Sequence, residues 1–194
     1  MKEDIPKSLV GLGLEEWYTS LKDEEKRIFL RYLNKVGITE NARDLLLAIA
    51  RASNEEENYN FAMLVASYGI DIGPEDMTSF LLMEELITAL VESEQYEEAK
   101  EVCFIALEMF PKLTEKLIEA NNGNIPKKMA CRNRLIDIVV GVDGDYDFAE
   151  RLLHDFVDKG ILQPEELSLR LNSLKIHRLQ RGFDMIFTLR PKEN

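Results

Sequence analysis

The sequence predicts an all-α protein of about nine or ten helices joined by short connections. Apolar residues recur at helical spacing, as Met83, Leu86, Ile87 and Leu90 do at i, i+3, i+4 and i+7. No segment alternates strictly between apolar and polar residues over the length of a strand. Proline and glycine also recur at positions typical of helix starts and helix ends. Together these patterns favour antiparallel helices packed with their neighbours in the chain.

Helix starts are indicated in part by proline, which fits a first turn because its missing N–H has no partner there. Acidic residues follow Pro74 and Pro164, which suits the positive end of the helix dipole. The predicted helices start roughly at Leu14, Asp23, Thr39, Glu55, Pro74, Tyr96, Leu113, Pro126, Tyr146 and Pro164.

Helix ends are predicted at three Gly-Ile pairs, which begin at Gly37, Gly69 and Gly160. Glycine adopts the left-handed conformation that commonly follows a last helical turn, and the isoleucine can fold back onto that turn. Near the N-terminus, Trp17 and Tyr18 are expected to be buried against the helix that starts at Asp23.

A Tyr-x-x-Ala pattern occurs three times, beginning at Tyr59, Tyr96 and Tyr146. The intervals are 37 and 50 residues. In the middle copy, Tyr96 is expected to fill a turn and Ala99 and Ala106 to be small contact residues. Cys103 lies between these two alanines, and Pro111 is expected to close the unit. The first copy has Gly69 at the second small position, and the third copy has Phe156 there.

The middle copy resembles one unit of the tetratricopeptide-repeat (TPR) family, whose period is about 34 residues. The resemblance implies helical hairpins stacked as a TPR-like α-solenoid, in which the pattern residues hold helices together and do not touch ligands. A compact helical bundle that repeats Tyr-x-x-Ala by chance is the alternative. We expect a single all-helical domain over residues 1–194, with a possible joint at 121–126.

Composition narrows the function classes. The 194 residues carry a net charge of -12, with a sequence pI of about 4.7, which disfavours broad binding to nucleic acid. Cys103 and Cys131 lie in apolar helical patterns and are expected to be reduced, as in a cytoplasmic protein. No segment has the roughly 20 apolar residues of a membrane span, so no membrane partner is expected.

No constellation of residues predicts catalysis, a cofactor or a metal site. Asp143, Asp145 and Asp147 alternate as in a calcium loop, but Phe148 and His154 occupy its sixth and twelfth positions. Helix capping by Asp143 or Asp145 is the role expected here. The two cysteines and two histidines lack the spacing of zinc ligands. We therefore expect neither an enzyme nor a metalloprotein.

Two segments concentrate basic residues in an otherwise acidic chain, 127–134 and 170–181. We expect Lys128, Arg132, Arg178 and Arg181 to line one surface that binds an acidic partner. The leading hypothesis is a small cytoplasmic adaptor or scaffold that binds a peptide or helix of a partner protein. The alternative is a nucleic-acid-associated regulator that uses the same two segments.

Overall fold

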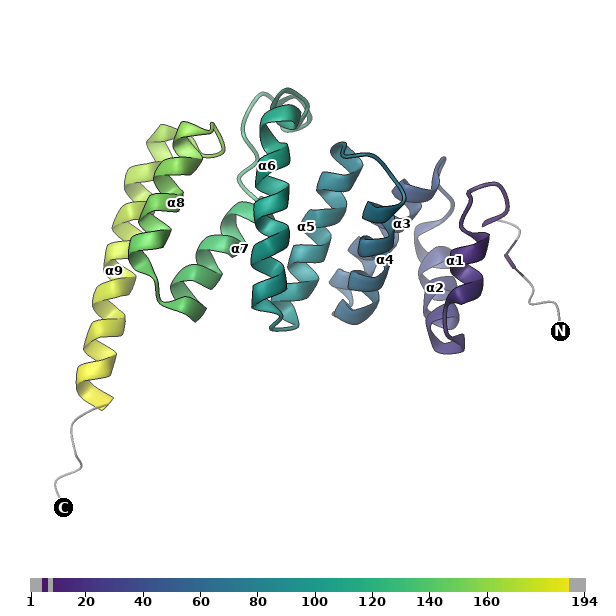
Figure 1. The fold of residues 1–194 in the computed structure, drawn as a ribbon, viewed down its shortest axis with the longest axis horizontal. Coiled ribbons are helices and arrows are strands. Elements are labelled where there is room, and N and C mark those ends of the chain that lie inside the picture. The colour runs from purple at the N-terminus through teal and green to yellow at the C-terminus, as the bar shows by residue number, and fades with distance from the viewer. Residues whose placement is uncertain (1–4, 7–8, 189–194) are drawn as a thin grey trace, which may run out of the picture. The chain divides into compact units, whose positions relative to one another are not determined.

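The computed structural model describes residues 5–6 and 9–188, with no side chains described for 183–188. All regular secondary structure in these residues is helical, and they contain no strand, which confirms the all-α prediction (Figure 1). The helices in the described ranges are α1 (Glu15–Ser20), α2 (Asp23–Val36), α3 (Ala42–Glu55), α4 (Tyr59–Asp71), α5 (Met77–Glu92), α6 (Tyr96–Ala120), α7 (Ala130–Ile138), the π-helix η2 (Val139–Asp143), α8 (Tyr146–Asp158) and α9 (Pro164–Thr188).

The chain divides into two compact units. The first unit comprises residues 1–109 and 128–134, and the second comprises 110–127 and 135–194. The boundaries therefore fall inside α6 and α7, and the 121–126 connection lies within the second unit. The expectation of one domain with a joint at 121–126 remains a prediction.

In the first unit, α3 packs against both α4 and α5, and α4 packs against α5, so three successive helices lie side by side (Figure 1). The aromatic residues of α1 are buried as predicted. Trp17 meets Phe29 of α2 edge-on, with ring centroids 5.6 Å apart, and it stacks on Tyr68 at 4.6 Å. Tyr18 packs against the same Phe29 ring. These contacts tie α1 to both α2 and α4.

The prediction that Pro111 closes a unit is wrong, as is the helix start predicted at Leu113. Helix α6 continues through Pro111 to Ala120. Proline inside a helix costs about 3 kcal/mol, because it removes a backbone hydrogen bond and crowds the preceding turn. Phe110, Leu113 and Leu117 continue one buried apolar face past that proline. Each buried side chain of this size contributes about 1.5–3 kcal/mol, enough in sum to offset the proline.

Helices end as predicted at two of the three Gly-Ile pairs, but the isoleucine folds back at only one of them. Gly160 (φ 68°) closely follows α8, and Ile161 is buried and donates its N–H to the Phe156 carbonyl. Gly37 (φ 78°, ψ -173°) directly follows α2, but Ile38 is 67% exposed. The third is wrong, because Gly69 lies inside α4, which continues to Asp71. A Cβ added at Gly69 would stand 2.9 Å from Cδ1 of Leu82 on α5. Gly69 is therefore needed for the close approach of two helices, not for a helix end.

The three Tyr-x-x-Ala copies share a turn geometry. Two residues before each tyrosine stands a left-handed residue, Glu57 (φ 59°), Glu94 (φ 60°) or Gly144 (φ 70°). In the first two turns the next residue donates its N–H to a carbonyl five residues back, in the pairs Asn58 to Ser53 and Gln95 to Leu90. The first two hairpins therefore repeat the same backbone turn at an interval of 37 residues.

The third turn contains one additional residue. Asp145 donates its N–H to Val139, six residues back, at 2.9 Å. The π-helix η2 ends directly before this turn, and a π-helix holds one residue more per hydrogen-bonded turn than an α-helix. The third hairpin thus keeps the left-handed residue and the tyrosine but accommodates an insertion.

The small residues of the repeat pattern are all buried. The N–H of Ala62, Ala99 and Ala149 each donates to the carbonyl of the residue before the tyrosine, at 3.0 Å in all three cases. Buried residues at the corresponding positions of the first two copies are Ala62, Ala66 and Gly69 in α4 and Ala99, Cys103 and Ala106 in α6. Tyr96 is half-buried at its turn.

The start of α7 is capped by a side chain from another helix. Met129, the residue before α7, has no side-chain oxygen that could accept hydrogen bonds from the free N–H groups at the start of that helix. Glu84 of α5 supplies the acceptor: its carboxylate accepts from the N–H of Ala130 at 2.5 Å and of Cys131 at 2.8 Å. Burial raises the pKa of Glu84, and hydrogen bonds from Cys131 and Ala130 oppose that rise only in part.

This capping contact predicts a pH dependence of stability. The pKa of Glu84 is raised in the folded protein, so the folded state binds this proton more tightly than the unfolded chain does. The resulting stabilisation is complete below the ordinary pKa near 4.5 and is lost as the pH rises through the raised folded value. Lowering the pH from neutrality toward the raised pKa should therefore increase the unfolding free energy of the wild-type protein relative to that of Glu84→Gln.

Urea denaturation at a series of pH values measures this difference directly. Glu101→Gln, which changes the same charge on an exposed position of α6, serves as the matched control. A difference between wild type and Glu84→Gln that stays constant with pH would contradict the assignment.

Candidate interaction surface

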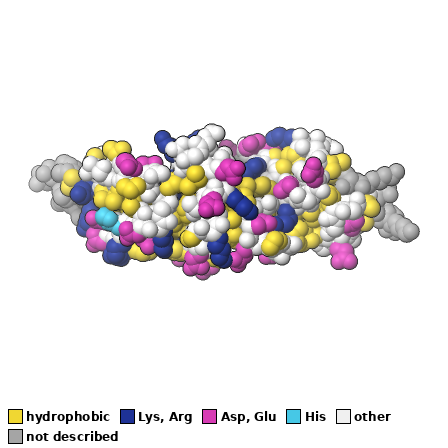
Figure 2. Space-filling view, turned by 90° about the horizontal axis from the view of Figure 1, so that it is seen from above, with side chains coloured by type: hydrophobic (Ala, Val, Ile, Leu, Met, Phe, Trp, Pro, Cys, Tyr) yellow, Lys and Arg dark blue, Asp and Glu magenta, His cyan; other side chains and the backbone are white. Residues whose placement is uncertain are grey.

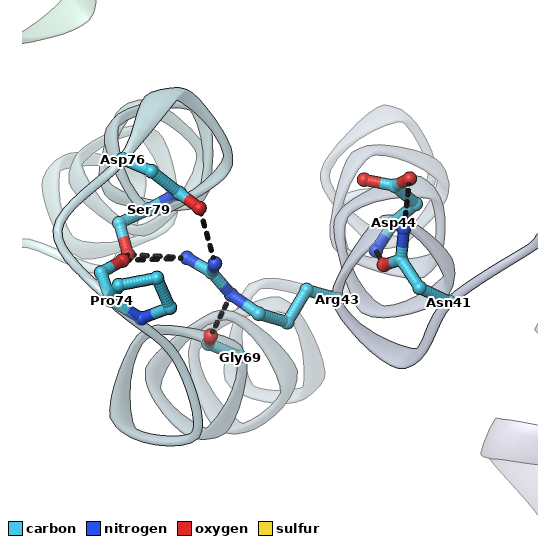
Figure 3. Close-up of polar contacts among 7 residues, drawn as sticks. All are labelled: Asn41, Arg43, Asp44, Gly69, Pro74, Asp76 and Ser79. Atoms are coloured by element: carbon cyan, nitrogen blue, oxygen red, sulfur yellow. Dashed lines mark hydrogen bonds and ion pairs between the residues drawn. The ribbon is translucent and has the colours of Figure 1, made fainter. Parts of the chain in front are cut away.

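The first unit contains a polar cluster around Arg43 of α3 (Figure 3). Its guanidinium donates to the Gly69 carbonyl at 3.2 Å, to Asp76 at 2.8 Å, to the Pro74 carbonyl at 3.2 Å and to the Ser79 hydroxyl at 2.5 Å. All three guanidinium nitrogens thus bind groups of α4, of α5 or of the turn between them. A pocket of about 490 Å³ adjoins this cluster.

The Arg43 cluster holds the fold rather than offering a free binding site. Asp76 caps α5 by accepting from the N–H of Ser79 at 3.0 Å. Burial alone would raise the pKa of Asp76, but hydrogen bonds from Arg43 and from the Ser79 backbone outweigh it and hold that pKa below its usual value. The cation in this pocket is therefore already neutralised by a carboxylate of the same chain.

The packing of Arg43 over Gly73 can be tested by a double-mutant cycle. A Cβ added at Gly73 would lie 2.3 Å from Nε of Arg43, so the guanidinium would have to leave its site. Gly73→Ala should lower the unfolding free energy by about 1–3 kcal/mol, because the groups that Arg43 satisfies lose their donor. The same substitution should cost far less in an Arg43→Ala background. Additive losses in urea denaturation would show that the two residues are not coupled.

In the second unit, α9 is joined to η2 and to the start of α8 by three polar contacts. Arg181 donates to the Val140 carbonyl at 3.0 Å, and Arg178 forms an ion pair with Asp147 at 2.8 Å. His177 Nδ1 lies 3.0 Å from the Tyr146 hydroxyl. Asp145 caps α8 by accepting from the N–H of Phe148, which confirms the capping role expected for Asp143 or Asp145.

A pocket of about 280 Å³ lies among α7, η2, α8 and α9 in the second unit. Ser173 does not hydrogen-bond to His177, whose ring instead meets Tyr146. The pocket therefore lacks the nucleophile–base contact of an acyl-transfer site in this structure. Its apolar lining consists of Ile136, Val140, Leu153 and Leu174. Its polar lining consists of Asp137, Arg170, Ser173 and His177, and Gly141 also lines it.

Large apolar side chains are exposed beside this pocket on α9. Leu169, Ile176 and Leu179 are 70%, 57% and 63% exposed. Their spacing of seven and three residues places them on one helix face, which we call the α9 stripe. Ser173 of the pocket lies one helical turn from both Leu169 and Ile176. The pocket and the α9 stripe therefore adjoin.

The charge of α9 differs from that of the chain as a whole. Residues 167–182 contain four basic residues and no acidic one. The first unit holds 23 acidic and 13 basic residues, a net charge of -10. The second unit holds 13 acidic and 11 basic residues, a net charge of -2. On the face drawn in Figure 2, acidic, basic and apolar side chains are interspersed. The four basic residues of this stretch are Arg170, Lys175, Arg178 and Arg181.

The structure corrects part of the predicted basic surface. Arg132 is 1% exposed and hydrogen-bonds through Nε to Asn133, so it does not line a surface. The apolar face of α7 is short, and Arg132 lies on its buried side with Cys131 and Leu135. Lys128 is exposed but belongs to the first unit, whereas Arg178 and Arg181 belong to the second. That Lys128 and these two arginines share a surface remains a prediction.

The two cysteines are buried and unpaired with each other. Burial raises the pKa of the Cys103 thiol to about 12, and that of Cys131 is raised as well, in both cases with a contribution from the nearby Glu84. Neither thiol is therefore a ready nucleophile or ligand. Over the described residues, no group of three or more His, Cys, Asp or Glu side chains could hold a metal ion. None of the helices described is long and apolar enough to cross a membrane.

Comparison of the chain with protein-family models, with curated proteins and with solved structures finds no match.

The α9 stripe is the feature that sequence reasoning missed. Leu169, Ile176 and Leu179 have ordinary helical spacing, which by itself indicates a buried face. The opposite face of the same helix carries Leu174, which is buried. Two apolar faces on one helix would have indicated that one of them lacks a partner.

Proposed function

We propose that this chain is a protein-interaction module, built from TPR-like hairpins, that binds an acidic amphipathic helix of a partner protein on the α9 stripe. The observation that supports this proposal most directly is the exposure of Leu169, Ile176 and Leu179 along one face of α9. Apolar side chains grouped on a surface are typical of sites that bind another protein.

The TPR-like part of the proposal is supported by the repeated turn. Hairpins α3–α4 and α5–α6 have the same left-handed residue, the same helix-closing hydrogen bond and the same buried small residues, at an interval of 37 residues. The packing of α3 on both α4 and α5 is what stacked hairpins require. In this interpretation the third hairpin, with η2 and Phe156, is a modified copy that ends the series.

The acidic character of the partner follows from the charge of α9. Residues 167–182 contain four basic residues and no acidic one, and Lys175 lies one helical turn from Leu179 of the stripe. Arg178 and Arg181 lie on the side of α9 that contacts Asp147 and the Val140 carbonyl, and Arg170 is ion-paired with Glu166. Charge complementarity of this kind raises the association rate and excludes basic partners.

A designed peptide tests the proposal. It has about 20 residues, long enough to be helical, with leucines at i, i+3, i+4 and i+7 and glutamates at most other positions. Fluorescence anisotropy should show binding that weakens with added salt, because exposed charges are screened over about 8 Å at physiological ionic strength. Ile176→Gln should weaken binding roughly tenfold or more, through loss of buried apolar area.

The matched control is Ile38→Gln. Ile38 is 67% exposed, comparable to Ile176, but it lies in the first unit. Equal losses in the two variants, or no binding by wild type, would contradict the proposed site. A peptide with lysine in place of glutamate should not bind at this site. Binding of a single-stranded RNA oligomer in preference to the acidic peptide would favour the nucleic-acid alternative instead.

A further inference from the structure

We propose that α6 offers a second docking surface, which binds a basic amphipathic helix of a partner protein through an aromatic side chain and flanking cations. The surface consists of Glu98, Glu101, Phe104 and Ile105, and we call it the α6 face. It belongs to the first unit, whereas the α9 stripe belongs to the second. The inference goes beyond the proposed function, because it concerns another surface and a partner of the opposite charge.

The α6 face combines exposed apolar side chains with exposed acidic ones. Phe104 and Ile105 are 39% and 50% exposed, and Glu98 and Glu101 are exposed as well. Spacings of three, four and seven residues place the four side chains on one side of the helix. Large apolar side chains that are grouped on a surface and bordered by polar ones are typical of a protein-binding site.

The carboxylates of the α6 face are not neutralised by bases of their own helix. Residues 96–109 contain one base, Lys100, and it forms an ion pair with Glu97 at 2.9 Å. Neither Glu98 nor Glu101 has a basic residue three or four positions away. These carboxylates attract a cationic partner and repel an acidic one, and the net charge of -10 on the first unit acts in the same direction.

The first hairpin shows how the equivalent apolar position is covered. The interval of 37 residues aligns Ile105 of α6 with Tyr68 of α4. The indole of Trp17, on α1, stacks on the Tyr68 ring, with centroids 4.6 Å apart and 7° between the ring planes. Ile105 is half exposed and lacks such a cover. An aromatic side chain of the partner would supply at Ile105 the contact that Trp17 supplies at Tyr68.

The same alignment indicates where the partner must differ from α1 and α2. Glu98 aligns with Phe61, which is buried and stacks on Tyr32 of α2 with ring centroids 5.8 Å apart. Glu101 aligns with Leu64, which is half-buried. At both positions α6 has a charge where α4 has an apolar side chain. A helix that covers α6 must therefore present cations where α2 presents an aromatic ring.

The geometry of α6 fixes the spacing expected in the partner. Ile105 lies four residues from Glu101 and seven from Glu98, which is about 6 Å and about 10.5 Å along the axis at roughly 1.5 Å per residue. A partner helix that lies along α6 should therefore carry bases four and seven positions from its aromatic residue. Those spacings place the bases and the aromatic residue on one face of the partner.

Two peptides of about 20 residues test the inference. In the first, tryptophan stands at the centre of an alanine-rich helix, and lysines stand four and seven positions to each side, so that either helix direction is matched. In the second, the lysines stand two and five positions from the tryptophan, on the opposite face. The peptides have the same composition and charge. Fluorescence anisotropy should show that the first binds wild type about tenfold more tightly or better.

Variants of the chain locate the site. Ile105→Gln should weaken binding of the first peptide roughly tenfold, whereas Ile38→Gln, at a 67% exposed position of the first unit, should not. Glu101→Lys should weaken it roughly three- to tenfold. Glu40→Lys makes the same change of charge at another exposed position of the first unit and should weaken binding less than about twofold. Ile176→Gln should leave binding of this peptide unchanged.

Several results would overturn the α6 face. Equal binding of the two peptides, or equal effects of Glu101→Lys and Glu40→Lys, would show that net charge alone attracts them. Absence of binding, or loss of binding in Ile176→Gln, would overturn it as well. The acidic peptide tests the α9 stripe separately, so either surface can be refuted while the other stands. Circular dichroism melting curves verify that each variant is folded.

Discussion

The packing of the first unit depends on the close approach of helices at positions that admit only small side chains. At Gly69, α4 lies so near α5 that an added Cβ would stand 2.9 Å from Leu82, and it would also stand 3.4 Å from Cβ of Leu46 on α3. Three helices therefore meet at one position without a side chain. Ala106 occupies the corresponding position 37 residues later and is fully buried. The interval between the hairpins is set by this contact and by the turn that precedes it.

Much of the helical pattern could be predicted from the sequence because it depends on local features. Tyr96, Tyr146 and Pro164 begin helices as predicted, and Ala99, Cys103 and Ala106 are buried as predicted. The errors at Gly69 and Pro111 share one cause. Glycine and proline have local preferences of about 1–3 kcal/mol, and packing along a continuous apolar face can exceed these. Whether such a face continues is decided by residues distant in sequence.

The candidate site was predictable only in part for a related reason. A basic residue on a helix predicts a charged surface, yet Arg132 is buried, because the register of α7 is fixed by the contact of Glu84 with its first turn. That contact joins residues 46 positions apart and has no counterpart in local sequence. Conversely, the exposure of Leu169, Ile176 and Leu179 depends on which face of α9 meets α8. Polar contacts such as Tyr146 with His177 and Asp147 with Arg178 select that face.

The unfolding free energy of one pair of variants tests the central claim most directly. Ala106 and Glu101 lie on the same helix, the former fully buried and the latter exposed. If small residues set the helix spacing, Ala106→Leu should lower the unfolding free energy in urea by about 1–3 kcal/mol through overpacking. Glu101→Leu should change it by less than about 0.5 kcal/mol. Equal effects of the two substitutions would contradict the assignment of the buried face and, with it, the repeated hairpin.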